Sequence, residues 1–284
     1  MSNEPLLAHV NGIESKRISI ADRGLAFGDG IFDTLLWRHS QPQFLSLHID
    51  RLVQGLQVLR IALSRRRLEE ALDNFFVALK AHNLADAVIK TIVSRGEGRG
   101  FLPAGDIQAS IIIAAYPFKI NHDQQRDGVS LILCQGRLRC SPDLAGLKHL
   151  NQLDHVLAAL EVADRNADEG LLLDVDGNVV ETVSSNVFMM LDGKLQTPSL
   201  KTAGVEGTIR RVVLEALAPN LSIEAIEATI AYEHLVTADE IFICNSIAGI
   251  RPVNNLEGRK LPIGPITRKL QHELTELQHR QEKL

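Results

Sequence analysis

The chain has 284 residues, of which 45% are hydrophobic and 23% are charged, and its formal net charge is −5. This length suits a protein of two domains with a large buried core, and the composition is that of an ordinary globular protein. The mild negative charge lacks the strong basic excess expected of a nucleic-acid-binding protein. Since the chain has no run of about 18 apolar residues and no basic, apolar start, we expect neither a membrane-spanning helix nor a signal peptide.

Cysteine and histidine usage gives no sign of a metal site. The three cysteines, Cys134, Cys140 and Cys244, have spacings that fit neither a zinc site nor a disulfide framework. They predict reduced structural thiols in a cytoplasmic protein. The ten histidines include no His-Glu-x-x-His pattern, so no metal is expected.

Residues 1–117 are predicted to form an N-terminal domain that mixes strands and helices. Apolar and β-branched runs indicate strands, and apolar residues at steps of three and four indicate helices. The expected strands are 8–10 and 17–20 around the turn Asn11-Gly12, then 31–37, 43–47, 87–94 and 107–116. The expected helices are 48–63 and 67–82. We predict a small domain of the α+β class.

Residues 118–127 are polar and charged, which predicts an interdomain link or a surface loop. A larger, β-rich C-terminal domain is expected over residues 128–284. Its predicted strands are 129–134, 170–174 and 178–182 around Asp176-Gly177, 186–191 and 194–197 around Asp192-Gly193, and 241–244. Its predicted helices begin at 147, span 207–217, and span 267–284. The whole chain is therefore expected to be a two-domain α+β protein.

Lys148 lies where leucines recur at steps of three and four, from Leu147 to Leu160. This spacing predicts a helix with one apolar face that begins near residue 147. Lys148 would then lie in the first helical turn, where the helix dipole disfavours a cation and lowers the pKa of the amine. A neutral amine is the nucleophile that Schiff-base chemistry requires. The alternative, which the local sequence alone favours, is an exposed lysine on a loop.

Two further features stand at junctions between predicted elements. Glu181 interrupts an apolar strand, where alternation places it on the same face as Val179 and Val183, so it lies in solvent or in a pocket with a cationic partner. The glycine-rich segment 203–210 opens into a helix, and free backbone N–H groups at such a start bind phosphate. Each feature is common alone. Together with Lys148 they match the needs of pyridoxal phosphate: a lysine, a carboxylate for the ring nitrogen and a phosphate clamp.

These residues lie within motifs that resemble the fold-type-IV pyridoxal-phosphate enzymes. This family includes branched-chain aminotransferases, D-amino-acid aminotransferases and aminodeoxychorismate lyases. The matching motifs cover nearly the whole chain, at residues 22–34, 48–52, 181–188, 204–210 and 244–253. The resemblance implies a two-domain fold like that of D-amino-acid aminotransferase, and a homodimer.

By this resemblance Lys148 holds the cofactor and Glu181 pairs with its pyridine nitrogen. Arg51 would bind the phosphate, for which its fork of donors is suited. Without the resemblance to the family, we would interpret Arg51 as a surface residue on a helix. Three more residues are expected at the phosphate, namely Thr208 and Ile209 through backbone N–H groups and Ser246 through its hydroxyl or N–H group. The family has a threonine where this chain has Ile209, so that side-chain contact is in doubt, whereas the backbone contact is not.

Within the family, the chain resembles the aminodeoxychorismate lyases in the sequence Lys-His-Leu-Asn at 148–151. Residues 27–30, 94–100 and 243–245 carry further lyase-like motifs, and the characteristic motifs of branched-chain aminotransferases are missing. Gln152 departs from the lyases, which commonly have an arginine there. The resemblance implies conversion of the small molecule 4-amino-4-deoxychorismate to 4-aminobenzoate and pyruvate, in folate biosynthesis.

Two other functions stay open at this stage. A transaminase of D-amino or branched-chain amino acids would use Lys148, Glu181 and Arg51 in the same way, but would transfer the amino group to a keto acid. A protein that keeps the fold without the cofactor would act only in binding.

The resemblance also implies substrate contacts. Thr34 stands where a lyase hydroxyl is proposed to aid proton transfer to the leaving group, although an ordinary strand threonine fits equally well. Because the substrate carries two carboxylates, arginines are expected around it. Arg95 and Arg99 are the main candidates, in a mobile glycine-containing loop, with Arg38 and Arg251 as further possibilities. The loop lacks the ending of a nucleotide P-loop, so ATP binding is not expected.

Overall fold

The computed structural model describes residues 4–105 and 107–280. Within these residues the chain divides into two compact units. Among the described residues, the first comprises those up to Lys119 together with Leu147–Asn151, and the second comprises Ile120–Gly146 together with those from Gln152 onward. The division at Lys119 falls inside the predicted link. The short segment Leu147–Asn151, which the sequence prediction places in the C-terminal domain, belongs to the first unit.

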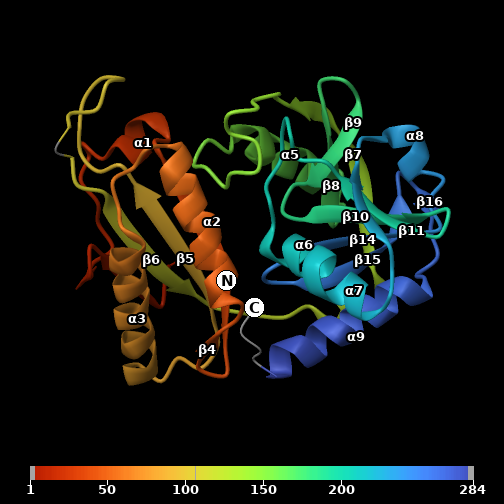
Figure 1. Cartoon of the computed structure of the whole chain (residues 1–284), viewed down its shortest axis with the longest axis horizontal. Coiled ribbons are helices and arrows are strands. Elements are labelled where there is room, and N and C mark those ends of the chain that lie inside the picture. Colours follow the sequence, from red (N-terminus) through yellow and green to blue (C-terminus); the bar gives the residue numbers. More distant parts are fainter. Residues whose placement is uncertain (1–3, 106, 281–284) are drawn as a thin grey trace. The chain divides into compact units, whose positions relative to one another are not determined.

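The first unit is an antiparallel sheet with two long helices on one face (Figure 1). Its elements are β1 (Leu7–Val10), β2 (Ile13–Glu14), α1 (Arg23–Phe27), β3 (Gly30–Arg38), β4 (Gln41–Pro42), α2 (Leu45–Val58), α3 (Arg65–Ala81), β5 (Ala87–Ser94) and β6 (Ser110–Tyr116). In the described residues the strand order is β2-β1-β6-β5-β3-β4. Alternate residues of these strands pack against α2 and α3, and Trp37 and Phe75 are fully buried in this core. Burying each such side chain contributes about 1.5–3 kcal/mol.

Two strands predicted in this unit are wrong. Residues 17–20 form no strand, because β2 ends at Glu14 and Ile20 stays 93% exposed. Residues 43–47 were expected to be a strand, but α2 begins at Leu45. The short apolar run fits both periods, and the helical spacing that continues to Leu56 decides the structure, because it buries one face of α2.

The second unit is built on a mixed sheet. In the described residues its strand order is β12-β11-β10-β14-β15-β7-β8-β9-β13, with β16 beside β15. The strands are β7 (Val129–Leu138), β8 (Glu169–Asp174), β9 (Asn178–Thr182), β10 (Asn186–Leu191), β11 (Lys194–Pro198), β12 (Ala225–Ala228), β13 (Ile230–Ala231), β14 (Glu240–Asn245), β15 (Gly249–Leu256) and β16 (Arg259–Lys260). The two Asp-Gly hairpins predicted in this unit are confirmed as β8–β9 and β10–β11.

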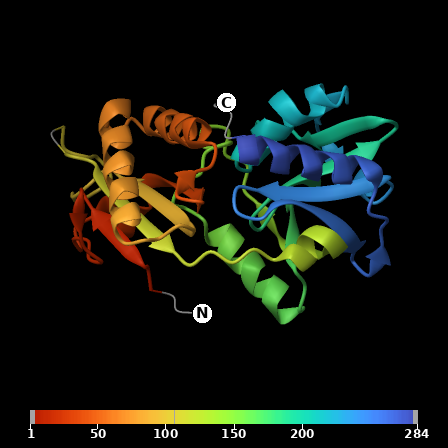
Figure 2. The ribbon, with the colours of Figure 1, turned by 90° about the horizontal axis from the view of Figure 1, so that it is seen from below.

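Helices lie against this sheet. They are α4 (His122–Asp127), α5 (Leu153–Asp164), α6 (Thr208–Val212), which continues through a π-helical turn (Val213–Leu217) into α7 (Ala218–Asn220), α8 (Tyr232–Leu235) and α9 (Pro265–Arg280). Figure 2 shows α9 lying along strands β14 and β15, with which it is in contact. The predicted link contains α4, and residues 281–284 of the predicted last helix lie outside the described residues. No helix in the described ranges is long and apolar enough to cross a bilayer.

The helix predicted to begin at residue 147 begins at Leu153 instead. Leu147 is buried in an extended segment, whereas Leu153, Leu157 and Leu160 are 75%, 65% and 58% exposed. The leucines before and after the true helix start therefore share a spacing by coincidence, and they do not form one buried face. This correction changes the physical setting of Lys148.

Candidate functional site

Lys148 lies in the extended segment Leu147–Asn151, the lysine segment, which pairs with one edge of β3. The backbone N–H of Phe32 donates to the carbonyl of Lys148 at 2.8 Å, and the N–H of Leu150 donates to the carbonyl of Gly30 at 3.0 Å. The two-residue strand β4 covers only the far end of this edge, and the start of the edge around Ile31 pairs with the lysine segment. Since α5 begins five residues after Lys148, the expected effect of a helix dipole on its pKa does not apply.

The side chain of Lys148 lies over the ring of Phe32, with the amine 4.6 Å from the ring centroid. The amine of Lys90 lies 5.2 Å from the same centroid. Thr34 follows Phe32 on the same face of β3 and is directly opposite Lys90 on β5. Lys148, Thr34 and Lys90 therefore border one polar, cationic patch, which we call the Phe32 face.

Lys90 was missed by the sequence analysis, although a signal for it existed. It interrupts the apolar, β-branched strand β5, where the alternating burial pattern leaves it half-buried. In the described part of the chain, Lys90 makes no ion pair with a carboxylate. A half-buried lysine within an apolar strand usually indicates either a partner or a ligand.

Arg51 lies on the opposite, helix-covered face of β3. Its Nε and Nη2 atoms donate to Oδ2 of Asp33 at 3.0 and 2.7 Å, and Nδ1 of His48 lies 2.6 Å from Oδ1. Burial by itself would raise the pKa of Asp33, but the charges and hydrogen bonds of Arg51 and His48 outweigh it and hold that pKa well below its ordinary value. Asp33 thereby fixes one edge of the guanidinium that the sequence analysis assigned to a phosphate.

Arg95 and Arg99 differ sharply in their surroundings. Nε and Nη2 of Arg95 donate to Asp29 at 2.8 and 3.0 Å. Its Nη1 and Nη2 atoms also donate to the carbonyls of Arg60 and Leu59, just after the end of α2. These contacts favour a structural role for Arg95. Arg99 is exposed, and it makes no hydrogen bond or ion pair within the described residues.

The two further arginine candidates also differ in their surroundings. Arg251 is buried, and its Nη2 donates to Oε1 of Glu169 at 3.2 Å and to Oγ of Ser185 at 3.0 Å, so it stabilises the interior of the second unit. Arg38 is half-buried at the end of β3, on the same face as Thr34.

Glu181 is buried in the second unit, with 3% of its surface exposed. Its Oε2 accepts a hydrogen bond from the N–H of Val205 at 2.9 Å, and its Oε1 lies 2.9 Å from Nε2 of His155 on α5. The expected alternation with Val179 is broken, because the register with β8 shifts between Leu172 and Leu173. Glu181 therefore lies opposite Leu172, on the face of the sheet covered by α5.

Two glycines allow the chain to pass close to this carboxylate. Gly204 has φ +90°, and a Cβ atom there would lie 2.7 Å from side-chain atoms of both Leu200 and Val180. A Cβ atom on Gly207 would lie 1.9 Å from Oδ1 of Asn186, whose Nδ2 donates to the carbonyl of Val205. Only glycine fits these close approaches, which explains the glycine-rich sequence before α6.

The start of α6 offers an unsatisfied buried hydroxyl. In the described structure, Oγ1 of Thr208 is buried without a hydrogen-bond partner, and Ile209 beside it is also buried. Such an orphaned group at a helix N-terminus fits a bound anion. Ser246 follows β14, in a turn where Oδ1 of Asn245 accepts from the N–H groups of Ile247 and Ala248. The contacts of α6 with β14 bring these elements of the second unit together.

The predicted site residues thus fall into two groups. Lys148, Thr34, Arg51, Arg95 and Arg99 belong to the first unit, and Glu181, Thr208, Ile209 and Ser246 belong to the second. Gly146, which pairs with Val205 in the second unit, precedes Lys148 by two residues in the chain. A buried carboxylate, an orphaned hydroxyl at a helix start and a lysine amine over an aromatic ring fit the chemical groups of pyridoxal phosphate.

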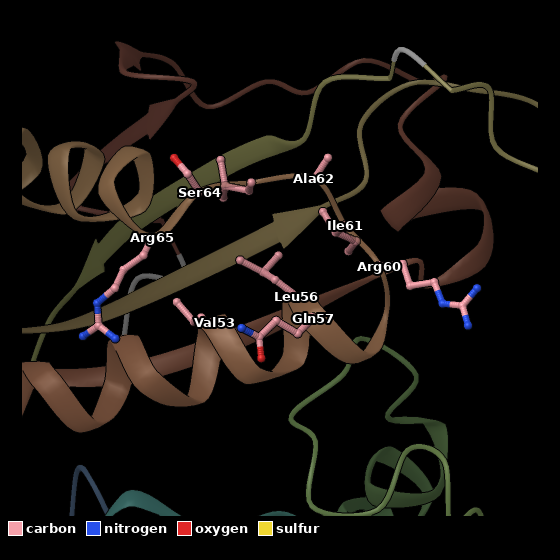
Figure 3. A pocket seen from close by; sticks show the side chains of 9 residues that line it. Val53, Leu56, Gln57, Arg60, Ile61, Ala62, Ser64 and Arg65 are labelled. Atoms are coloured by element: carbon pink, nitrogen blue, oxygen red, sulfur yellow. The ribbon is translucent and has the colours of Figure 1, made fainter.

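A separate pocket of about 500 Å³ lies between α2 and the segment that follows it (Figure 3). Its lining includes none of the predicted site residues. The guanidinium of Arg65 at its rim is engaged by Asp50 and Glu69, and the other lining residues are mostly apolar, such as Val53 and Leu56. The described lining of this pocket has no lysine and no carboxylate, so it does not fit pyridoxal phosphate.

Comparison with known proteins identifies the class of this chain. Residues 30–256 match the family model of the class IV aminotransferases. The chain is 34% identical over 274 residues to aminodeoxychorismate lyase from Vibrio harveyi, which covers 93% of this chain and 98% of the relative. It is also 33% identical over 267 residues to a putative branched-chain-amino-acid aminotransferase from Methanocaldococcus jannaschii, covering 92% and 91%.

Among solved structures, 4-amino-4-deoxychorismate lyase from Pseudomonas aeruginosa superimposes with a TM-score of 0.90 at 41% identity, covering 95% of this chain and 98% of that one. The chain therefore belongs to the class IV aminotransferase family and has its two-domain α+β fold. It is an enzyme of this family, whose cofactor is pyridoxal phosphate. The expected family, fold class and cofactor are confirmed.

The buried contacts of Asp33 with Arg51 and His48 predict that the free energy of unfolding depends on pH. Because the pKa of Asp33 is lowered in the folded chain, its stabilising effect is present above the pKa of the unfolded carboxyl, about 3.9, and is lost as the pH falls below it. We expect Asp33→Asn to lower the free energy of unfolding by about 3–5 kcal/mol at pH 7, because it breaks a buried pair. The difference from the wild type should shrink below about pH 4. Urea unfolding across this pH range measures it, and a difference that stays constant contradicts the assignment.

Proposed function

We propose that this chain is an aminodeoxychorismate lyase, which converts 4-amino-4-deoxychorismate to 4-aminobenzoate and pyruvate. The observation that carries the proposal is the Phe32 face, where Thr34 and Lys90 share the strand surface that Lys148 overlies. A hydroxyl and a second amine beside Lys148 suit a substrate with two carboxylates. A branched aliphatic substrate requires an apolar surface there, since polar groups buried against it lose their hydrogen bonds.

The similarity to lyases supports this proposal. The chain is 41% identical to the Pseudomonas aeruginosa lyase and 34% identical to the Vibrio harveyi lyase. A transaminase is the second candidate, because the Methanocaldococcus jannaschii relative, at 33% identity, is named as a putative aminotransferase.

In the proposed site, Lys148 attaches the cofactor and Glu181 holds its pyridine nitrogen. The N–H groups of Thr208 and Ile209 and the orphaned Thr208 hydroxyl would bind the phosphate, together with Ser246. Arg51 stays in this set by the family resemblance, and Asp33 orients its guanidinium through Nε and Nη2.

Bound pyridoxal phosphate supplies an electron sink for the carbon that carries the substrate nitrogen. The amine of Lys148 takes the proton from that carbon. Thr34 lies on the same strand face and would assist proton transfer to the departing enolpyruvyl oxygen. Because loss of this group leaves an aromatic ring, the reaction requires no amino acceptor.

The substrate carboxylates are assigned to two cations. Arg99 stays a candidate because it is exposed and without a partner in the described residues, whereas Arg95 is held by Asp29 and two backbone carbonyls. Lys90 is added because it lies on the Phe32 face. Cations at these positions match the charge of a dicarboxylate.

We also propose a homodimer in the cytoplasm. The side chains of Leu153, Val156, Leu157 and Leu160 form an exposed apolar face on α5, and such a face suits contact with a second copy. Cys134, Cys140 and Cys244 are free thiols, as is usual in a reducing compartment.

The lyase proposal predicts product without an amino acceptor. Purified protein given enzymatically generated aminodeoxychorismate, and no keto acid, should release 4-aminobenzoate and pyruvate in equal amounts. Fluorescence of aminobenzoate and a coupled lactate dehydrogenase assay measure the two products. Lys148→Ala is the matched control and should form neither.

The alternative proposal, a transaminase, predicts the opposite pattern of products. Pyruvate formed from D-alanine with 2-oxoglutarate, or glutamate formed from leucine with 2-oxoglutarate, without product from aminodeoxychorismate, would overturn the lyase assignment in favour of transamination.

Thr34 provides a second prediction. Thr34→Val keeps the shape of the side chain but removes the hydroxyl, so elimination should slow by roughly 10²-fold or more. The absorbance of the bound cofactor should not change, because Thr34 is assigned to the leaving group and not to cofactor binding. Steady-state turnover and the visible spectrum are the measurements. A variant with wild-type turnover would remove Thr34 from the mechanism.

A further inference from the structure

The carboxylate of Glu181 is held from two sides within the second unit. The N–H of Val205 donates to Oε2, and Nε2 of His155 lies 2.9 Å from Oε1. A carboxylate accepts hydrogen bonds, so this contact fits the His155 tautomer that has its N–H group at Nε2. Each oxygen therefore has its own donor, which fixes the rotation of the carboxylate plane.

The position of His155 follows from the packing of α5. Ala158 is the residue that α5 buries, and it packs with Leu172 and Val180 on the sheet. His155 precedes Ala158 by three residues, so both lie on the helix face that meets the sheet. The imidazole side chain is 16% exposed and the Glu181 side chain 5%, so their contact is largely shielded from water.

We propose that His155 is a positioning residue, which orients Glu181 so that a remaining lone pair of the carboxylate faces the pyridine nitrogen of the cofactor. This inference rests on the role that the proposed function gives to Glu181. His155 touches neither substrate nor cofactor in this assignment and acts only through the carboxylate.

A purely structural role for His155 makes a different prediction. If the imidazole only satisfies a buried carboxylate, its loss weakens the fold and reduces the binding of every cofactor analogue alike. If it orients Glu181, its loss reduces only the binding that depends on the pyridine nitrogen. An analogue in which that nitrogen is replaced by carbon, 1-deazapyridoxal phosphate, separates these cases because it gives Glu181 nothing to hold.

The experiment measures cofactor affinity in the full-length apoprotein. Wild type, His155→Leu, His155→Ala and His155→Gln are titrated with pyridoxal phosphate and with the deaza analogue, and binding is followed by protein fluorescence. We expect His155→Leu and His155→Ala to bind pyridoxal phosphate about 10-fold more weakly, the effect of one hydrogen bond to a charged group. Their affinity for the analogue should not change, and His155→Gln, which keeps a donor, should restore much of the loss.

The outcomes separate the inference from the function on which it rests. An equal loss of affinity for both ligands, or unchanged affinity for both, overturns the positioning role. A wild-type protein that binds both ligands equally removes the assigned role of Glu181, and the role of His155 with it. Thermal unfolding of each apoprotein shows whether a variant folds; if His155→Leu does not, His155→Ala and His155→Gln carry the comparison.

Discussion

The pairing of the lysine segment with the edge of β3 is the interaction on which the proposed chemistry depends. The hydrogen bonds between Phe32 and Lys148 and between Gly30 and Leu150 hold this segment in an extended form. In this arrangement the amine of Lys148 lies over the Phe32 ring and borders the strand face that carries Thr34 and Lys90. Such preorganisation is what the proposed role of Lys148 requires.

The second unit supplies a buried carboxylate, which is also held by hydrogen bonds. Glu181 is buried, and two donors compensate the cost of removing its charge from water. The glycines before α6 let the backbone of Val205 approach it, and the same segment leads into a helix start with an unsatisfied hydroxyl. The glycine-rich segment before α6 thus both donates to the buried carboxylate and provides the helix start.

Sequence reasoning predicted the elements whose signals are local. The Asp-Gly turns fixed both hairpins of the second unit, and the β-branched run of residues 87–94 matches β5. It failed where a non-local contact decides the structure. The leucines at 147 and 150 share the spacing of α5, but pairing with β3 keeps them extended, and no local pattern reveals that pairing.

The candidate site shows the same difference between local signals and non-local contacts. Its residue types could be read from motifs, but their partners could not, because Asp33, His155 and Lys90 meet Arg51, Glu181 and Phe32 across separate elements. The register shift beside Glu181 is a further example, since strict alternation would place it on the same face as Val179. Contacts between distant segments follow from the whole fold, and the sequence constrains them only through packing.

The most direct test of this account is to locate the covalent link to the cofactor. The holoprotein is reduced with borohydride, digested, and sequenced by mass spectrometry. The account predicts a phosphopyridoxyl group on Lys148 alone. Lys90 is the internal comparison, because its amine lies near the same aromatic ring. An adduct on Lys90 or on another lysine, or no adduct at all, would contradict the account.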